Sequence, residues 1–263
     1  HDVTEPTPTP SVGVQLYTLR ELSDRAEDLL DLVAEAGADA VETVGHHGVE
    51  APFLRDALDR RGLRAVSSHL QLAALEADLD GEVAFARTVG IGTLVVPWLP
   101  PAERPTDRRG WTGLGARLAR LGARVREAGL RLAYHNHDFE LAEVEGRDGL
   151  AWLLDAAEPE VLDVELDLAW VARAGGDPAA ALRRWGERTR LLHVKDLAPA
   201  GAAPDEDGWA TVGQGTLPWP ALLELASEVG VEAWLLEHDR PSDPARTVRE
   251  GCAYLRDRRQ RWG

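Results

Sequence analysis

The chain has 263 residues, of which 44% are hydrophobic and 28% are charged, and its formal net charge is -16. No stretch approaches the roughly 18 consecutive apolar residues of a membrane span, so a membrane protein is excluded. The acidic balance repels phosphate backbones, and we do not expect nucleic acid as a partner. The single cysteine, Cys252, cannot form an internal disulfide, which agrees with a cytoplasmic protein.

The first ten residues differ from the rest of the chain. His1 to Pro10 carry alternating Thr and Pro without an apolar period, which predicts an extended, disordered lead-in. The lead-in lacks the apolar core of a signal peptide. We therefore expect a single folded domain over residues 11–263.

From Ser11 onward, a short apolar run followed by a longer stretch of helical period occurs eight times. The expected strands are Val12–Tyr17, Ala40–Val44, Arg64–His69, Thr93–Pro97, Arg131–His135, Val161–Leu166, Leu191–Val194 and Ala233–Glu237. The expected helices are Ala26–Ala36, Ala51–Arg61, Val83–Val89, Leu114–Ala128, Leu150–Ala156, Pro178–Trp185, Trp219–Val229 and Ala245–Arg256. Gly37, Gly62, Gly90, Gly129 and Gly230 follow five of these helices, where left-handed helix ends are expected.

Strand and helix alternating eight times in this length is the pattern of a single (β/α)8 TIM barrel. The main alternative is an open, doubly wound sheet. Such a sheet usually carries a glycine-rich turn after its first strand, and no G-x-G-x-x-G occurs here. The pattern therefore favours the closed barrel.

Catalytic groups of such barrels lie at the C-terminal ends of the strands, and polar residues are concentrated at the ends of the expected strands here. Alternation with period two decides which of them face inward. It predicts one inward residue on each of four successive strands: His135, Asp167, His193 and Glu237. A set of imidazoles and carboxylates suits one divalent ion such as Mn, Co, Zn, Fe or Mg. A network without metal is the alternative.

Lysine and arginine sum to 29, yet only Lys195 is lysine. It lies two residues after His193, on the same expected inward face. Unlike arginine, a desolvated lysine can lose its proton. The sequence therefore predicts either a proton-transfer role for Lys195 or an ion pair with a neighbouring carboxylate.

Several stretches of the chain resemble a known family. They are Gly13–Arg20, Ala133–Glu140, Glu165–Trp170, Leu192–Asp196, Val212–Leu217 and Leu236–Asp239, with Gly175 to Pro178. His-x-Lys-Asp followed by Gly-x-Gly-Thr is the more specific part. The chain is thus similar to the xylose-isomerase-like barrels, the sugar phosphate isomerase/epimerase superfamily.

The resemblance implies a divalent ion held by Glu, Asp, His and Glu, which correspond to His135, Asp167, His193 and Glu237. His135 stands where many relatives carry glutamate, so that His135 and His137 both remain candidates for the strand-five ligand. In ketose epimerases the two glutamates act as the proton-transfer bases. The chain therefore resembles the inosose dehydratases and keto-sugar lyases more closely.

We expect chemistry that begins with removal of a proton next to a carbonyl. The candidate bases are Glu237, His137, Lys195 and Glu140. Glu42 and His69 are expected to bind substrate hydroxyls, and Trp98, Trp111 and Trp170 are expected to include platforms for a sugar ring. His46 and His47 are expected at the surface, and the segment Leu197–Trp209 is expected to be a mobile loop.

The leading hypothesis is a metal-dependent isomerase or epimerase acting on a keto sugar or cyclitol. The alternative is a metal-dependent dehydratase or lyase of the inosose dehydratase or 3-keto-glycoside eliminase type. A non-catalytic sugar-binding subunit is less favoured. A phosphodiester hydrolase is disfavoured by the charge of -16. A homo-oligomer is compatible with the sequence, which does not settle the oligomeric state.

Overall fold

The structure is a computed structural model that describes residues 9–22 and 24–261. Most of the predicted lead-in, residues 1–8, lies outside the described residues. Of its last two residues, Thr9 is exposed and Pro10 is buried.

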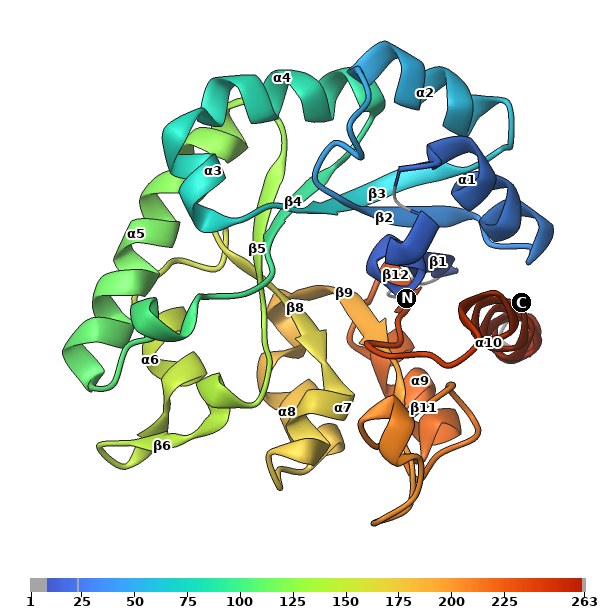
Figure 1. The fold of residues 1–263 in the computed structure, drawn as a ribbon. Helices are drawn as coiled ribbons and strands as arrows, with labels where there is room; N and C mark the ends of the chain where they lie inside the picture. The colour runs from blue at the N-terminus through green and yellow to red at the C-terminus, as the bar shows by residue number, and fades with distance from the viewer. Residues whose placement is uncertain (1–8, 23, 262–263) are drawn as a thin grey trace, which may run out of the picture.

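Eight parallel strands form a closed barrel, as the sequence predicts (Figure 1). Their order around the barrel is β1-β12-β9-β8-β5-β4-β3-β2. Barrel strands that follow one another in the sequence are therefore neighbours in space. The barrel strands are β1 (Ser11–Gln15), β2 (Ala40–Val44), β3 (Arg64–His69), β4 (Thr93–Val96), β5 (Arg131–His135), β8 (Asp163–Asp167), β9 (Thr189–Val194) and β12 (Ala233–Leu236).

Helices follow the strands and lie around the barrel (Figure 1). They are α1 (Ala26–Glu35), α2 (Ala51–Asp59), α3 (Leu72–Ala77), α4 (Leu79–Val89), α5 (Arg108–Glu127), α6 (Gly149–Asp155), α7 (Leu168–Arg173), α8 (Pro178–Trp185), α9 (Trp219–Glu228) and α10 (Pro244–Gln260). The 3-10 turns are η1 (Leu16–Leu22), η2 (Pro101–Glu103), η3 (Phe139–Leu141), η4 (Gly186–Arg188) and η5 (Pro204–Glu206). Two small hairpins pair β6 (Glu143–Val144) with β7 (Arg147–Asp148), and β10 (Asp196–Leu197) with β11 (Trp209–Ala210).

The expected elements are all present, and the differences lie at their ends. The first strand ends at Gln15 rather than Tyr17, because the Tyr17 backbone N–H donates to Gln15 Oε1 at 2.8 Å and the chain turns into η1. The sixth barrel strand begins at Asp163, because the N–H groups of Val161 and Leu162 both donate to the Glu158 carbonyl in a turn. Gly37, Gly62, Gly90, Gly129 and Gly230 all have positive φ, which confirms the predicted helix ends.

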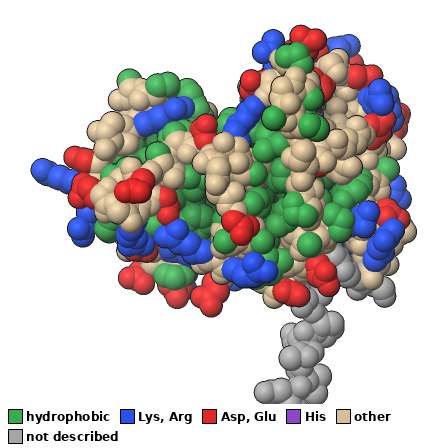
Figure 2. Space-filling view, turned by 90° about the horizontal axis from the view of Figure 1, so that it is seen from below, with side chains coloured by type: hydrophobic (Ala, Val, Ile, Leu, Met, Phe, Trp, Pro, Cys, Tyr) green, Lys and Arg blue, Asp and Glu red, His purple; other side chains and the backbone are tan. Residues whose placement is uncertain are grey.

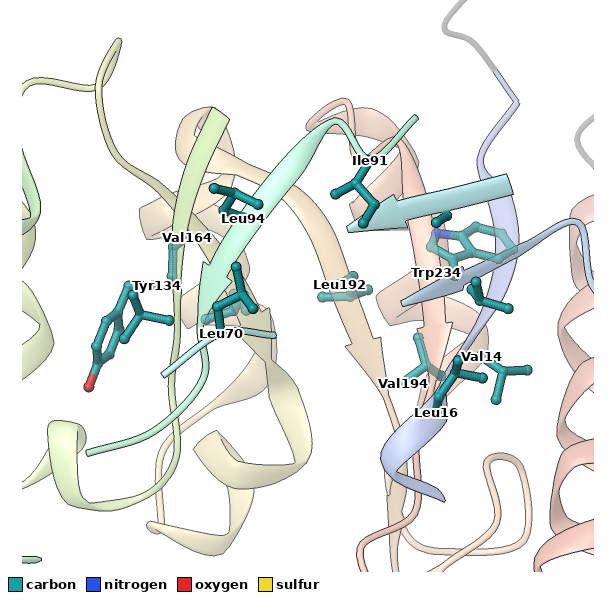
Figure 3. Packing of buried hydrophobic residues seen from close by; sticks show 14 of the residues in the cluster. Val14, Leu16, Leu70, Ile91, Leu94, Tyr134, Val164, Leu192, Val194 and Trp234 are labelled. Atoms are coloured by element: carbon teal, nitrogen blue, oxygen red, sulfur yellow. The ribbon is translucent and has the colours of Figure 1, made fainter. Parts of the chain in front are cut away.

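Alternation along the strands divides the buried residues into two layers. On β9, for example, Leu192 packs in the large cluster between barrel and helices, whereas Leu191 lies in a small cluster inside the barrel. Figure 3 shows part of the large cluster, in which Tyr134 points away from the barrel strands. The small cluster forms an apolar floor of Val95, Ala133, Leu191, Ala233 and Leu235. Polar side chains occupy the next inward positions toward the C-terminal mouth.

The surface carries both signs of charge. On the face shown in Figure 2, acidic and basic side chains are interspersed around hydrophobic side chains near the centre. Many of the charges are paired, as Arg117 is with Glu76 and Arg55 with Asp59. Among the described residues, no helix combines the length and apolar character needed to cross a membrane.

Gly122 allows α5 to lie unusually close to the segment that precedes β8. A Cβ atom at Gly122 would collide with the carbonyl oxygen of Val161, whereas a Cβ at the exposed Gly113 would meet nothing within 4 Å. We predict that Gly122→Ala lowers the free energy of unfolding by about 1–3 kcal/mol, the range typical of overpacking. Gly113→Ala should raise it by about 0.5–1 kcal/mol through helix propensity. Urea denaturation of both variants tests this, and equal effects would contradict the close approach.

Candidate active site

A cleft of about 850 Å³ opens at the C-terminal mouth of the barrel. Its walls come from segments that follow the barrel strands. The lining residues are Tyr17, Val44, Gly45, His46, His69, Leu70, Gln71, Ala74, Glu82, Pro97, Trp98, His135, His137, Trp170, Glu237 and Asp239. The polar residues at the C-terminal ends of the strands are therefore accessible from this cleft.

A deep layer of polar side chains lies on the apolar floor. Glu42 Oε1 lies 2.7 Å from His193 Nε2 and 2.9 Å from His69 Nε2. Glu165 Oε1 lies 2.7 Å from His69 Nε2, 2.9 Å from His193 Nε2 and 3.1 Å from His135 Nδ1. Gln15 and Ser67 donate to the two oxygens of Glu42 at 2.7 and 2.5 Å. The carboxylates thus hold three imidazoles in fixed orientations.

Mutual charge controls protonation in this layer. Burial opposes a charge on His69, but Glu42 and Glu165 raise its pKa to about 9. Burial also opposes ionisation of Glu42, yet the charges of His69 and His193 hold its pKa well below the ordinary value. Burial lowers the pKa of His135 well below its ordinary value, and neighbouring positive charges add to this effect. His135 is therefore a neutral imidazole, suited to donate a lone pair.

A second group, which we call the outer group, contains three of the four predicted metal ligands: Asp167, His193 and Glu237, of which Glu237 lines the cleft. His193 Nδ1 lies 3.0 Å from Glu237 Oε2 and 3.7 Å from Asp167 Oδ2. The fourth predicted ligand, His135, has its Nε2 atom 3.9 Å from Asp167 Oδ2. Among the described residues, two sets of potential ligand atoms lie within 4.8 Å of one another: Asp167, His193 and Glu237, and His69, His135, Glu165 and His193.

Lys195 is fully buried beside this outer group. Its Nζ atom lies 2.7 Å from Glu237 Oε2, 2.8 Å from Asp239 Oδ1 and 3.0 Å from Asp167 Oδ2. Burial opposes the ammonium charge, but Asp167, Asp239 and Glu237 outweigh it and raise the pKa of Lys195 well above its ordinary value. The ion pair that the sequence offered as the alternative for Lys195 is therefore present, and the raised pKa favours the ammonium form.

His137 and Glu140, both candidate bases, lie in different surroundings. His137 lines the cleft, and its buried Nδ1 atom has no hydrogen-bond partner. Burial, and then the charge of Lys195, lower the pKa of His137 to about 3, so the ring is neutral. Glu140 is fully buried behind β5, where its oxygens accept hydrogen bonds from the Tyr134 hydroxyl and the His137 backbone N–H, both at 2.8 Å. The structure thus removes Glu140 from the candidate bases, because it positions the loop rather than facing the cleft.

Of the three tryptophans expected as platforms for a sugar ring, two line the cleft and one is in the core. Trp98 and Trp170 line the cleft, and the Trp170 ring lies 5.0 Å from the His137 ring. Trp111 is only 1% exposed and packs against Gly149, so it belongs to the core and is not a platform. His46 is at the surface, as expected, with its side chain 40% exposed, and it lines the cleft.

The segment Leu197–Trp209 was expected to be a mobile loop. Its first and last residues, Leu197 and Trp209, pair with each other in the β10–β11 hairpin. Arg173 on α7 also forms an ion pair with Asp207, two residues before Trp209.

Two residues of the site were not assigned roles from the sequence. Glu165 lies two positions before Asp167, so the period-two rule that selected Asp167 also places Glu165 inside the barrel. Asp239 follows the last barrel strand, outside any period, and only the three-dimensional structure brings it to Lys195.

Removal of the lysine charge should destabilise the barrel. Lys195→Met leaves three carboxylates around one site without their ammonium, and we predict a loss of about 3–5 kcal/mol in the free energy of unfolding. Arg55→Met breaks an exposed pair with Asp59 and should cost less than about 1 kcal/mol. Denaturant titration in the presence of a chelator measures both, and a Lys195→Met loss as small as that of the control would contradict the assigned charge balance.

Comparisons with known proteins identify relatives of the chain. The chain is 27% identical over 240 residues to the rhizopine catabolism protein MocC of Rhizobium meliloti, covering 80% of this chain and 73% of that protein. It is 26% identical to an inosose dehydratase of Lacticaseibacillus casei, over 52% of this chain and 49% of that enzyme. The chain thus spans about half the length of this curated relative.

Solved structures share the fold. A sugar phosphate isomerase/epimerase from Parabacteroides distasonis superposes with a TM-score of 0.76 at 23% identity, covering 96% of both chains. The IOLI protein with a bound zinc atom superposes with a TM-score of 0.74 at 14% identity, covering 96% of this chain and 99% of that one. The model of the family described as xylose isomerase-like TIM barrel matches residues 30–258. The protein belongs to the xylose isomerase-like TIM barrel family.

Proposed function

We propose that the protein is a divalent-metal-dependent enzyme that removes a proton next to the carbonyl of a keto sugar or cyclitol. One observation carries this proposal: Glu237, a member of the buried donor set of Asp167, His193 and Glu237, lines the same cleft as His137, whose buried Nδ1 atom makes no hydrogen bond. A cation site next to a group that can accept a proton is the arrangement that such chemistry requires.

The donor set fits a divalent ion. Asp167 Oδ2 and Glu165 Oε2 are buried and make no hydrogen bond, although Asp167 Oδ2 is close to Lys195 Nζ. Asp167, His193, Glu237 and His135 would hold the ion, a mixture of N and O donors that suits Mn, Co, Zn or Fe. When bound, the ion polarises the carbonyl oxygen and stabilises the negative charge that develops as the proton leaves.

The deep layer supports these ligands. A metal-binding imidazole usually donates its other N–H to a carboxylate. Here the nitrogens that face away from the outer group are held in this way: His135 Nδ1 lies against Glu165, and His193 Nε2 lies against Glu42 and Glu165. We therefore assign Glu42 and Glu165 the role of orienting the ligands. Glu42 is fully buried under His193. Of the two residues expected to bind substrate hydroxyls, Glu42 and His69, only His69 lines the cleft.

His137 is the proposed proton acceptor. Of the four candidate bases, Lys195 is held as an ammonium and Glu140 is outside the cleft. Glu237 is committed through Oε2 to His193 Nδ1 at 3.0 Å and to Lys195 Nζ at 2.7 Å. Trp170 lies beside His137 and can exclude water from it, while the Lys195 ammonium provides a fixed positive charge.

Elimination fits the residues better than epimerisation. An epimerase needs a second acid-base group on the opposite face of the substrate, and the strand-five position holds His135, which is neutral and bound through Nδ1 to Glu165. A lyase needs one base and a leaving group next to the carbon that is deprotonated. The similarity to inosose dehydratases points in the same direction. We therefore favour a dehydratase or lyase over the isomerase or epimerase expected from the sequence.

The two ligand groups make different predictions for metal content. Asp167→Asn should abolish stoichiometric binding of Mn²⁺ or Zn²⁺, because Asp167 belongs only to the outer group. Glu165→Gln should weaken metal binding by about 10–100-fold. The site of this variant should still be fully occupied at high metal concentration. Calorimetric titration and elemental analysis measure both, with Asp59→Asn on the surface as the matched control. Loss of metal in Glu165→Gln but not in Asp167→Asn would move the ion to the deep layer.

Proton removal is tested by isotope exchange. In deuterated water with Mn²⁺, the wild-type protein should exchange the hydrogen next to the carbonyl of a keto sugar such as an inosose, observed by NMR. His137→Asn should slow this exchange by about 10²–10⁴-fold, the usual contribution of a general base, and retain its metal. Asp138→Asn, a change at the exposed neighbouring residue, is the control. Unchanged exchange in His137→Asn would reject its role.

A further inference from the structure

Trp209 is a buried tryptophan that lies outside the hydrophobic clusters of the protein. Its side chain is only 1% exposed, although every residue of the preceding segment, residues 199–208, is at least partly exposed. Among the described residues, Trp209 belongs neither to the large cluster around the barrel nor to the small cluster inside it. Other buried tryptophans do belong to the large cluster: Trp111, Trp185, Trp219 and Trp234. Packing in the core therefore does not account for the burial of Trp209.

Two cations and a second indole contact the Trp209 ring. The Lys195 Nζ atom lies 4.9 Å from the ring centroid, and the guanidinium carbon of Arg173 lies 3.8 Å from it. The Trp170 ring meets the Trp209 ring edge-on, with centroids 4.7 Å apart. Both cations are within the distance of about 6 Å at which an indole attracts positive charge. The Trp209 ring thus offers an electron-rich surface to the buried ammonium.

The two indoles complete the surroundings of Lys195. Its Nζ atom is within 3.0 Å of a carboxylate oxygen from each of Asp167, Glu237 and Asp239. The Trp170 ring centroid lies 5.4 Å from the same Nζ atom. Three carboxylates at similar distances do not by themselves fix a flexible lysine side chain in one position. Rigid rings beside the ammonium limit its movement and keep water away, which strengthens its ion pairs.

The hairpin that carries Trp209 is attached to α7. Arg173, near the end of α7, forms an ion pair with Asp207 of the hairpin at 3.3 Å. The N-cap residue of the same helix is Asp167, one of the carboxylates around Lys195. The position of the indole ring is therefore linked to that of this carboxylate.

A second attachment joins the hairpin to the loop after β12. The hydroxyl and the backbone N–H of Ser242 both donate to Glu206 Oε1 at 2.7 Å. The same loop carries Asp239, three residues before Ser242. The hairpin thus connects two of the elements that supply carboxylates to Lys195.

We propose that Trp209 is a positioning residue that confines the Lys195 ammonium to the space between its three carboxylates. The β10–β11 hairpin carries the ring, and its attachments to α7 and to the loop after β12 place the ring against the ammonium. The consequence for catalysis rests on the proposed function, in which Lys195 provides a fixed positive charge at the site.

Nuclear magnetic resonance tests the position of the ammonium directly. Because Lys195 is the only lysine of the chain, protein labelled with ¹³C,¹⁵N-lysine gives one set of lysine signals. In wild type with a chelator, the hydrogens on Cε should resonate upfield of those of free lysine, because the ring currents of the indoles shield them. They should also show nuclear Overhauser contacts with the Trp209 ring.

Three variants separate the ring from mere bulk. Trp209→Phe retains an aromatic ring and should keep the upfield shift, whereas Trp209→Leu should move the signals toward those of free lysine. Trp185→Leu removes a buried tryptophan of α8 and should leave the lysine signals unchanged. Unshifted signals without contacts to Trp209 in wild type would overturn the proposal, and so would equal shifts in wild type and Trp209→Leu.

Isotope exchange of the hydrogen next to the carbonyl tests the consequence for catalysis. Trp209→Leu should lower kcat by about 10–100-fold, an effect of the size that misplacement of a group in the site produces, with KM and metal content near those of wild type. Trp209→Phe and Trp185→Leu should retain most of the wild-type kcat. Equal losses in Trp209→Phe and Trp209→Leu would reject the positioning role. If wild type exchanges no hydrogen, the proposed function fails, whereas the lysine signals still decide whether Trp209 positions Lys195.

Discussion

Charge balance inside the barrel is the constraint on which the rest of the structure depends. A carboxylate moved out of water is costly unless a positive charge or several hydrogen bonds compensate it. The interior near the mouth holds the carboxyl groups of Glu42, Glu165, Asp167, Glu237 and Asp239. The positive groups among them are the ammonium of Lys195 and the imidazole of His69, whose pKa is raised to about 9. If every carboxyl group is ionised and His193 is neutral as a metal ligand, three negative charges remain, and a divalent ion neutralises two of them.

This balance separates the site into layers with different tasks. In the deep layer, Glu42 and Glu165 orient imidazoles and are shut off from the cleft. In the outer group, burial raises the pKa of Asp167, and Lys195 offsets this effect only in part, so this carboxylate gains most from a cation. His137 stands apart from the carboxylates as a neutral ring. Orientation, cation binding and proton transfer are therefore assigned to different side chains.

The sequence predicted the fold and much of the site for physical reasons. The period-two alternation of strands fixes which residues face inward, and it selected His135, Asp167, His193 and Glu237. It left the role of Lys195 open between proton transfer and an ion pair, because the protonation state of a lysine depends on how many carboxylates surround it, and one of these, Asp239, comes from the loop after β12. It could not place Glu140 and Trp111, which lie in a 3-10 turn and a helix where no strand period applies.

The central claim is that a divalent ion binds at the outer group and offsets most of its excess negative charge. Anomalous diffraction from crystals grown with Mn²⁺ tests it most directly. The account predicts one strong peak within coordination distance of Asp167, His193 and Glu237, with the Lys195 ammonium moved toward Asp239. A peak enclosed by His69, Glu165 and His135, or no peak at saturating Mn²⁺, would contradict it.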